Sequence, residues 1–329
     1  MGRSLLTIKD LHIDYRVRGE TIRAVRGVSL ELGFGETLCL VGESGSGKTT
    51  LAMAIAGALP ANAIIRSGEI ILNNVNILKD KEHPRKLVSL IPQEVGSSLS
   101  PFHTVGQVFL DVLTSKGVAD KGEALKIARS TLNLVGFSDA DRVLKSYPHE
   151  LSGGMLQRVL IALAISKKPL ILIADEPTSM IDASLKRGVV ELLKNIVLAQ
   201  RVSMIVVTHD IALAPHLCGR IAIMYSGEIV EDGLSAEILA NPMHPYTVML
   251  LESIPRILSP RKLKAIPGLP PDPRSAPIGC SFEPRCPKAI KGLCDKVKPP
   301  LATIESTRRV SCHLVKGNEG VTLDEDTSS

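Results

Sequence analysis

The stretch that most constrains the fold runs from Gly42 to Thr50, with the sequence GESGSGKTT. It matches the pattern G-x-x-x-x-G-K-[ST], which binds the phosphates of a nucleoside triphosphate when it follows a strand and opens a helix. The apolar run 36–41 before it predicts a buried strand, and the run 51–56 after it predicts a helix. The chain is therefore expected to contain an α/β domain of the P-loop NTPase class that binds ATP or GTP.

The residue types in this stretch suit phosphate binding. Glycines let successive backbone N–H groups turn inward around an anion, and the helix N-terminus adds partial positive charge. Lys48 is placed to reach the β- and γ-phosphates, and the hydroxyl of Thr49 is placed to bind Mg²⁺. The predicted phosphate-binding residues are Gly42, Glu43, Ser44, Gly45, Ser46, Gly47, Lys48, Thr49 and Thr50.

Length and composition indicate an ordinary globular protein. The 329 residues can hold one large domain or two modest ones, and the hydrophobic content of 44% is ample for a core. No apolar run reaches the roughly 18 residues of a membrane-spanning helix. The N-terminus lacks the apolar core of a signal peptide, so we expect a cytoplasmic protein. A net charge of +5 is too weak a global signal for nucleic-acid binding.

Strand patterns at 6–15 and 28–32 predict an antiparallel layer beside the nucleotide fold. Tyr15 lies in the first of them, where its ring could stack on a purine, although a strand Tyr more often has a structural role. The apolar spacing between 104 and 145 predicts a small helical subdomain. A hairpin at 221–231 is expected to close the domain.

An adjacent pair of acids follows the apolar run 170–174, which is typical of a strand covered on both faces. We expect Asp175 to hold Mg²⁺ and Glu176 to orient and polarise the attacking water. Two acids at a strand end are usually surface residues, but the P-loop and the apolar run favour the catalytic interpretation.

Two other polar residues also end predicted strands. Gln93 follows the strand predicted at 86–91, where its amide could reach the metal and the attacking water. His209 follows the strand predicted at 203–208. A lone His is more often structural, yet one at a strand end of a P-loop sheet can contact the γ-phosphate.

A further string, LSGGMLQR, occupies positions 151–158. Ser152 can cap a helix that continues through Ile165, and the two following glycines let a phosphate approach its positive N-terminus. An ordinary capped amphipathic helix is the alternative, but the string is far more specific than a cap.

Taken in order, these motifs resemble an ABC-type ATPase over roughly residues 5–240. They are the P-loop, Gln93, LSGGMLQ at 151–157, ILIADE at 171–176, SMID at 179–182 and His209. The strings YPHE at 147–150, HPY at 244–246 and GCSFEPRCP at 279–287 are similar to the dipeptide/oligopeptide/nickel importer branch. That resemblance spans about residues 5–314.

The resemblance implies a RecA-like core with an antiparallel β-subdomain, a helical signature subdomain and a small irregular, Cys-rich C-terminal region. It places the ATPase domain at 1–240, its helical subdomain at about 99–159, the importer-family region at 241–317 and a disordered acidic tail at 318–329. Two ATPase subunits are expected to pair head to tail, so that each ATP lies between the P-loop of one and the signature helix of the other.

The resemblance also implies roles for single residues. Tyr15 would stack on adenine, while Gln93 and His209 would be the Q-loop glutamine and the switch histidine. Asp182 would lie in the D-loop, where SMID departs from the commoner SALD but keeps the Asp. Residues 94–102 would dock a coupling helix of a membrane subunit. The residues expected to complete a partner's ATP site are Ser152, Gly153, Gly154 and Gln157.

The implied function is ATP hydrolysis that powers uptake of dipeptides or oligopeptides through an ABC importer, with the subunit peripheral on the cytoplasmic face of the membrane. The expected partners are a second ATPase subunit, identical or related, two permease subunits and an extracytoplasmic substrate-binding protein. Oligosaccharide or nickel is the alternative cargo. A soluble ABC ATPase acting on nucleic acid or ribosomes is disfavoured, because the chain has one cassette and no room for a long coiled coil.

The C-terminal region has its own signals. Seven prolines between positions 255 and 277 exclude a regular helix or a central strand and predict a linker or a wrapping arm. The spacing of the cysteines that follow leaves zinc and an iron–sulfur cluster open, and the family resemblance favours a [4Fe–4S] cluster. The predicted ligands are Cys280, Cys286, Cys294 and Cys312.

The chain has six cysteines, and in a cytoplasmic protein they favour metal binding or burial over disulfides. Cys39 lies in a predicted core strand and Cys218 is isolated in the sequence. Both are therefore expected to be unpaired.

Overall fold

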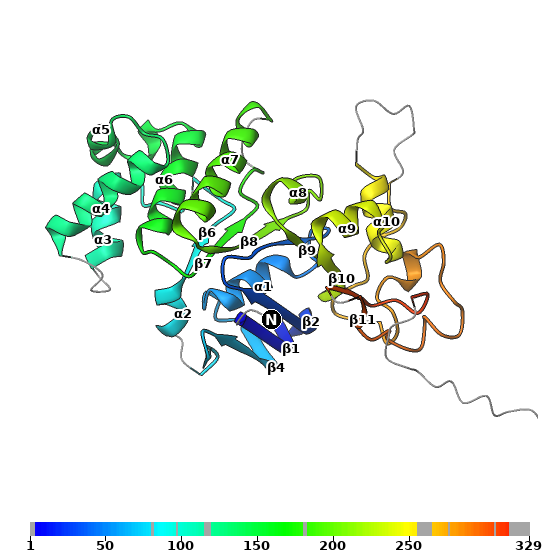
Figure 1. Cartoon of the computed structure of the whole chain (residues 1–329). Helices are drawn as coiled ribbons and strands as arrows, with labels where there is room; N and C mark the ends of the chain where they lie inside the picture. The colour runs from blue at the N-terminus through cyan, green and yellow to red at the C-terminus, as the bar shows by residue number, and fades with distance from the viewer. Residues whose placement is uncertain are drawn as a thin grey trace, which may run out of the picture.

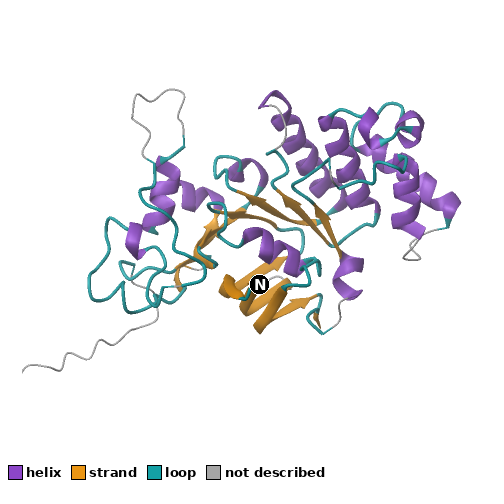
Figure 2. Ribbon diagram, turned by 180° about the vertical axis from the view of Figure 1, so that it is seen from behind, coloured by secondary structure: helices purple, strands orange, loops and turns teal. Residues whose placement is uncertain are grey.

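The computed structural model describes residues 4–79, 82–96, 98–114, 120–179, 183–254, 265–275, 277–305 and 307–315. Two sheets and the helices around them organise these residues (Figures 1 and 2). The smaller sheet has the order β2-β1-β4-β5 and is antiparallel throughout, which confirms the predicted antiparallel layer. Its strands are β1 (Ser4–Val17), β2 (Glu20–Gly33), β4 (Ala63–Leu72) and β5 (Val75–Asn76).

The larger sheet has the strand order β11-β12-β10-β9-β3-β8-β7-β6 among the described residues. The last five strands in this order, from β9 to β6, run parallel to one another, so their carboxyl ends lie along one edge. The strand predicted at 203–208 is confirmed, and those predicted at 36–41 and 170–174 are confirmed with shifted ends. The parallel strands are β3 (Thr37–Val41), β6 (Val88–Ile91), β7 (Ile171–Asp175), β8 (Ser203–Thr208) and β9 (Arg220–Tyr225).

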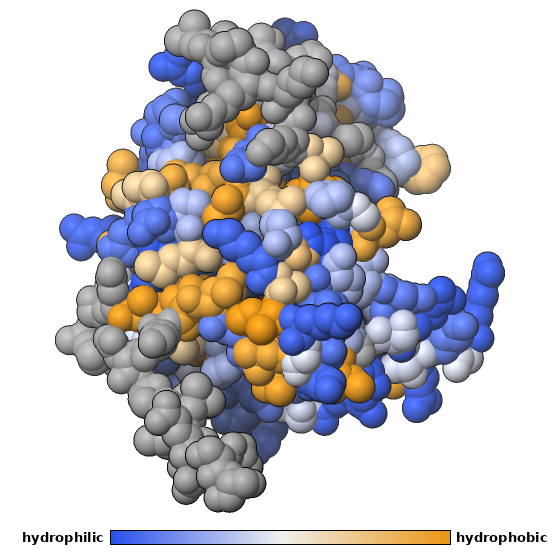
Figure 3. Space-filling view, turned by 90° about the vertical axis from the view of Figure 1, so that its right-hand side faces the viewer, coloured by the Kyte–Doolittle hydropathy of each residue, from blue (hydrophilic) through white to orange (hydrophobic). Residues whose placement is uncertain are grey.

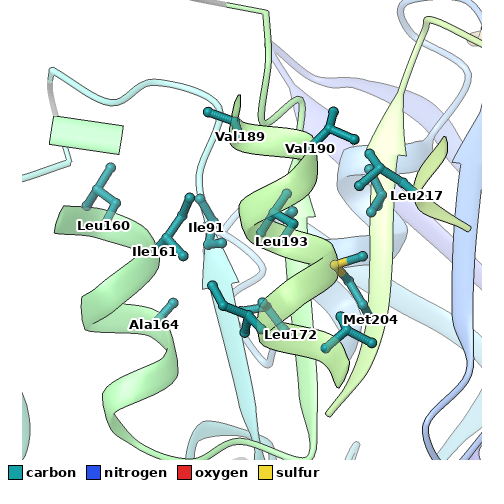
Figure 4. Close-up of a cluster of buried hydrophobic side chains, with 14 of the residues drawn as sticks. Ile91, Leu160, Ile161, Ala164, Leu172, Val189, Val190, Leu193, Met204 and Leu217 are labelled. Carbon is teal, nitrogen blue, oxygen red and sulfur yellow. The ribbon is translucent and has the colours of Figure 1, made fainter. Parts of the chain in front are cut away.

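The parallel strands are apolar on both faces because each face covers a separate core. Leu38 and Leu40 of β3 lie in the core shared with the smaller sheet and with α1 (Lys48–Ile55). Val41 of the same strand lies in the opposite core, beneath the helices. Figure 4 shows part of that second core, where Ile161 and Leu193 pack near the strands.

Helices cover the second core. The four that follow β6 pack together and include the signature helix α6. Asp120, Asp139 and Ser152 each accept a hydrogen bond from a backbone N–H three positions on, which satisfies donors that a helix start leaves free. The helices are α3 (Val105–Thr114), α4 (Lys121–Leu134), α5 (Ala140–Lys145), α6 (Gly153–Ser166), α7 (Ala183–Gln200) and α8 (Ala214–Leu217). The helix α2 (Glu82–Leu87) precedes β6, and its Leu87 packs against the first core.

The predicted hairpin is present, since β9 pairs in antiparallel fashion with β10 (Glu228–Leu234). The helices α9 (Ser235–Ala240) and α10 (Pro245–Glu252) follow it. The described part of the proline-rich segment, 265–275, contains no helix or strand, as its prolines predict.

The C-terminal region is not irregular throughout, and here the structure differs from the prediction. Two short strands, β11 (Ala302–Glu305) and β12 (Arg308–Val310), join the larger sheet beside β10. A buried ion pair from Arg308 to Glu231 and a partly exposed one from Arg309 to Asp232 hold this edge. The free edge of β10 offers unpaired backbone groups to the returning chain, and no local sequence pattern reveals that edge.

Cys39 and Cys218 form a disulfide, so the expectation that both are unpaired is wrong. Their Cα atoms are 5.6 Å apart, and both side chains are buried. Cys39 lies on β3, and Cys218 follows α8 just before β9, the strand that pairs with β3. With 179 positions between the two cysteines, only the sheet topology brings them together.

Figure 3 shows the molecule from the side of α10 and β11, where apolar residues form patches among polar ones. Two C-terminal side chains, Leu269 and Ile278, are strongly exposed. Among the residues that the structure describes, no helix combines the length and the apolar character needed to cross a membrane.

Candidate active site

A cavity of about 930 Å³ opens at the edge of the larger sheet where the parallel strands end. Its size suits a ligand as large as a nucleotide. The carboxyl edge of a parallel sheet is where ligands of this fold class bind. The lining residues that were predicted from the sequence are Tyr15, Glu43, Ser44, Gly45, Gly47, Lys48, Thr49, Thr50, Gln93, Glu176 and His209.

The phosphate loop connects β3 to α1, as predicted. Gly47 has a φ of 98° and directly precedes the helix. A Cβ at Gly47 would overlap the carbonyl oxygen of Ala24, and one at Gly42 would overlap that of Met224. The loop therefore needs glycine at both positions for close approach, and at Gly47 also for its left-handed conformation.

Lys48 is buried in the loop that it serves. Its Nζ donates hydrogen bonds to the carbonyl oxygens of Gly42 (2.9 Å) and Glu43 (2.8 Å) and to Oγ of Ser46 (3.2 Å). Burial lowers the pKa of Lys48, while the nearby carboxylates, Glu176 foremost, act in the opposite direction. The ammonium group is thus held within the loop by two backbone carbonyl oxygens and one hydroxyl oxygen.

Thr49 and Asp175 come together from α1 and β7. Oγ1 of Thr49 donates a hydrogen bond to Oδ1 of Asp175 over 3.3 Å. Burial raises the pKa of Asp175, and the hydrogen bond from Thr49 opposes that rise. Hydroxyl and carboxylate oxygens are hard ligands of the kind Mg²⁺ takes alongside water and phosphate, so these two residues fit the predicted magnesium site.

Glu176 and His209 are in direct contact. Nδ1 of the His209 ring lies 2.7 Å from Oε1 of Glu176, and the backbone N–H of His209 donates to the same oxygen over 3.0 Å. The backbone N–H of Glu176 donates to the carbonyl of Val207 on β8. Glu176 has a φ of 49°, a left-handed conformation that costs a non-Gly residue free energy. The surrounding sheet therefore fixes the direction of this carboxylate.

Tyr15 and Gln93 both line the cavity. The hydroxyl of Tyr15 donates to Oγ1 of Thr50 over 3.2 Å, which places its ring at the cavity wall. Gln93 follows β6 and is exposed to the cavity. Stacking by Tyr15 and water or metal contact by Gln93 stay predictions.

The signature residues Ser152, Gly153, Gly154 and Gln157 do not line this cavity. Ser152 and Gly153 are exposed at the start of α6, as a role in a partner's site requires. Gln157 is only 1% exposed, and its Nε2 has no hydrogen-bond partner among the described residues. It therefore cannot contact a nucleotide on another subunit in this conformation. Asp182 lies outside the described residues.

Part of the cavity wall was not predicted. Three residues come from β2, and five come from α10 and the proline-rich segment, which were assigned no role in nucleotide binding. The strings HPY and FEPRC marked the C-terminal region as special, but neither indicated contact with the phosphate loop. The additional lining residues are Ile22, Arg23, Ala24, Leu250, Ser253, Ala265, Ile266 and Pro273.

The four C-terminal cysteines line one small cavity, together with His244 and His313. Burial raises the pKa of the Cys280 thiol to about 11 and raises those of Cys286 and Cys312. Metal ligation needs thiolates. Within the described residues, no group of three or more His, Cys, Asp or Glu side chains is arranged to hold a metal ion. The geometry therefore gives no support to the predicted iron–sulfur cluster or to zinc.

Comparison with known proteins is consistent with the site. The profile described as "ABC transporter" matches residues 25–179, and that described as "Oligopeptide/dipeptide transporter, C-terminal region" matches residues 230–294. The dipeptide transport ATP-binding protein DppD of Bacillus subtilis is 40% identical over 318 residues, covering 94% of each chain. The oligopeptide transport ATP-binding protein OppD of Escherichia coli is 36% identical, covering 94% of this chain and 93% of that protein.

Among solved structures, the ATP-binding cassette MJ0796 in a dimeric post-hydrolysis state with ADP and Pi superposes with a TM-score of 0.61. The two chains are 28% identical in sequence, and their alignment covers 70% of this chain and 98% of the MJ0796 chain. The cassette fold therefore accounts for most of the chain, and the alignments with the transport ATP-binding proteins extend over 94% of it.

Proposed function

Because the chain belongs to the ATP-binding subunits of ABC transporters, in the dipeptide and oligopeptide branch, we propose that it powers the uptake of short peptides. The observation that carries this proposal is that the similarity to peptide transport proteins continues past the ATP-binding cassette into the C-terminal region. Relatives with peptide transport in their names align with 94% of the chain, and the C-terminal region has its own transporter profile. The enzymatic activity is that of an ABC-type ATPase.

In the proposed mechanism the phosphate loop binds the triphosphate, and Lys48 neutralises charge on the β- and γ-phosphates. Thr49 and Asp175 would hold Mg²⁺, with Gln93 lining the same cavity, and the bound ion would neutralise further phosphate charge. Glu176 orients the attacking water and accepts its proton.

His209 orients the carboxylate of Glu176 through their 2.7 Å contact and senses the γ-phosphate. Loss of the γ-phosphate would thus change the contacts of His209 and Glu176, which follow the neighbouring strands β8 and β7. Hydrolysis then reopens the paired subunits.

A second ATPase subunit completes each ATP site in this proposal. Ser152 and Gly153 are exposed and lie outside the chain's own cavity, so they are available to a nucleotide held by a partner. The partner is a copy of this chain or a related subunit. Two permease subunits receive the motion through residues 94–102, and an extracytoplasmic protein delivers cargo. The subunit works at the cytoplasmic face of the membrane, with residues 1–240 as its ATPase domain.

Peptide uptake in cells tests the cargo. Deleting the gene should abolish uptake of a labelled dipeptide or oligopeptide, and the intact chain, but not its Glu176→Gln variant, should restore it. Uptake of the free amino acids is the control and should not change. Loss of nickel or oligosaccharide uptake with normal peptide uptake would reject the proposed cargo while leaving the ATPase role in place.

The cysteine quartet remains the site proposed for a [4Fe–4S] cluster, with zinc as the alternative. It rests on the family resemblance and on four cysteines free of disulfides, since the described geometry of Cys280, Cys286, Cys294 and Cys312 does not arrange them as metal ligands. We expect protein purified without oxygen to contain about four iron and four acid-labile sulfide per chain if the cluster forms. Elemental and sulfide analysis measures this. Stoichiometric zinc without sulfide, or neither metal, would reject the cluster.

A further inference from the structure

Arg285 donates hydrogen bonds to five acceptors in three parts of the chain. A guanidinium group has five N–H donors, so every donor of this side chain is used. The side chain is only 4% exposed. The acceptors are the two carboxylate oxygens of Glu43, Oη of Tyr225 and the carbonyl oxygens of Ile266 and Pro267.

The two bonds to Glu43 form a bidentate pair with the phosphate loop. Nη1 of Arg285 lies 2.7 Å from Oε2 of Glu43, and Nη2 lies 3.1 Å from Oε1. Paired, charge-assisted bonds of this kind fix geometry as well as adding free energy. The first variable residue of the loop therefore has its side chain directed to the C-terminal region.

The backbone of Glu43 also forms a hydrogen bond with the C-terminal region. Its N–H donates to Oη of Tyr246 on α10 over 2.9 Å. Its carbonyl oxygen accepts a hydrogen bond from Nζ of Lys48 over 2.8 Å. The chain thus links Arg285, Glu43 and the phosphate-binding lysine through consecutive contacts.

The remaining bonds of Arg285 reach the proline-rich segment and β9. Nε donates to the carbonyl of Pro267 over 2.8 Å and Nη2 to that of Ile266 over 3.4 Å. Ile266 itself lines the nucleotide cavity. Arg285 also bonds to Tyr225 at the end of β9, with its guanidinium carbon 5.8 Å from the ring centroid. One side chain therefore joins the phosphate loop to the wall supplied by the proline-rich segment.

We propose that Arg285 is a positioning residue for ATP, which holds the phosphate loop through Glu43 and the wall formed by the proline-rich segment through Ile266. Arg285 does not itself line the cavity, so it acts through these neighbours. The C-terminal region is then part of the nucleotide site, whatever cargo the transporter carries.

The test compares ATP binding by the purified full-length chain and its variants. Calorimetric titration with Mg²⁺ and ATP is suitable, because the chain has no Trp for intrinsic fluorescence. Arg285→Gln should raise the Kd about tenfold, as expected for loss of a buried charge-assisted pair. Arg285→Lys should also raise it, because an ammonium group cannot replace the bidentate fork. Turnover at saturating ATP should change less than about twofold, since the chemistry is left to Glu176.

Arg309→Gln is the matched control. Arg309 also lies in the C-terminal region and pairs with a buried carboxylate, that of Asp232, but it does not line the nucleotide cavity. We expect it to lower the melting temperature to a similar extent and to leave the Kd for ATP unchanged. Equal effects of Arg309→Gln and Arg285→Gln on Kd would show a merely structural role and overturn the proposal.

Glu43→Gln provides a second test that leaves Arg285 in place. It should raise the Kd, and adding Arg285→Gln to it should have less effect than Arg285→Gln alone, because the two residues act as one pair. If Arg285→Gln does not fold, the Kd values for ATP of the Glu43→Gln and Arg285→Lys variants test the proposal instead. An unchanged Kd in either folded variant would overturn the proposal.

Discussion

Replacing Glu176 by Gln should lower ATP turnover by about 10² to 10⁴-fold and leave ATP binding intact, the range typical of removing a general base. The amide keeps the shape of the side chain and an oxygen that can accept the backbone N–H of His209, which in the native protein donates to Oε1 over 3.0 Å. It cannot accept a proton from water. Phosphate release measures turnover, and calorimetric titration measures ATP affinity.

Glu191→Gln is the control for this prediction. Glu191 lies on α7, is exposed and forms only a surface pair with Lys194 among the described contacts, so both turnover and affinity should be unchanged. Undiminished hydrolysis by the Glu176→Gln protein would refute the role given to Glu176. A large loss of ATP affinity in that variant would instead indicate that the carboxylate stabilises the bound state.

Replacing Lys48 by Ala should weaken ATP binding by about 10- to 100-fold, because it removes charged hydrogen bonds worth about 1.5 to 3 kcal/mol to the phosphates. The buried ammonium is held by the carbonyl oxygens of Gly42 and Glu43, so it is already in position when the triphosphate arrives. Calorimetric titration with Mg²⁺ and ATP measures the loss.

The outcome for Lys48 is interpretable only if the variant folds, so its melting temperature is measured in parallel. Lys194→Ala, an exposed lysine on α7, should bind ATP as the native chain does. Native affinity in a folded Lys48→Ala protein would contradict the assignment of Lys48 to the phosphates.

Much of the core and of the nucleotide site could be predicted because the signals are local. The strand before Gly42, the helix after Lys48 and the apolar run before Asp175 each follow from a few consecutive residues. Parallel strands then bring their carboxyl ends to one edge, which is why Glu176 and His209 meet although they are distant in the sequence.

Contacts between segments that are far apart in the sequence could not be predicted in this way. The pairing of Cys39 with Cys218 depends on the position of α8 beside β3. The addition of β12 to β10 depends on an edge that exists only in the folded sheet. A sequence pattern reports which faces are apolar, but not which distant segment will cover them.

The stretch from Gly42 to Thr50 shows most clearly what the sequence determines by itself and what depends on the tertiary structure. Its glycines, its lysine and its hydroxyls determined by themselves that the chain binds a triphosphate, because backbone geometry and charge suffice to specify a phosphate cradle. Only the tertiary structure decided where the side chain of Glu43 lies. It is bound by Arg285, 242 positions away, because the C-terminal region folds back over the phosphate loop.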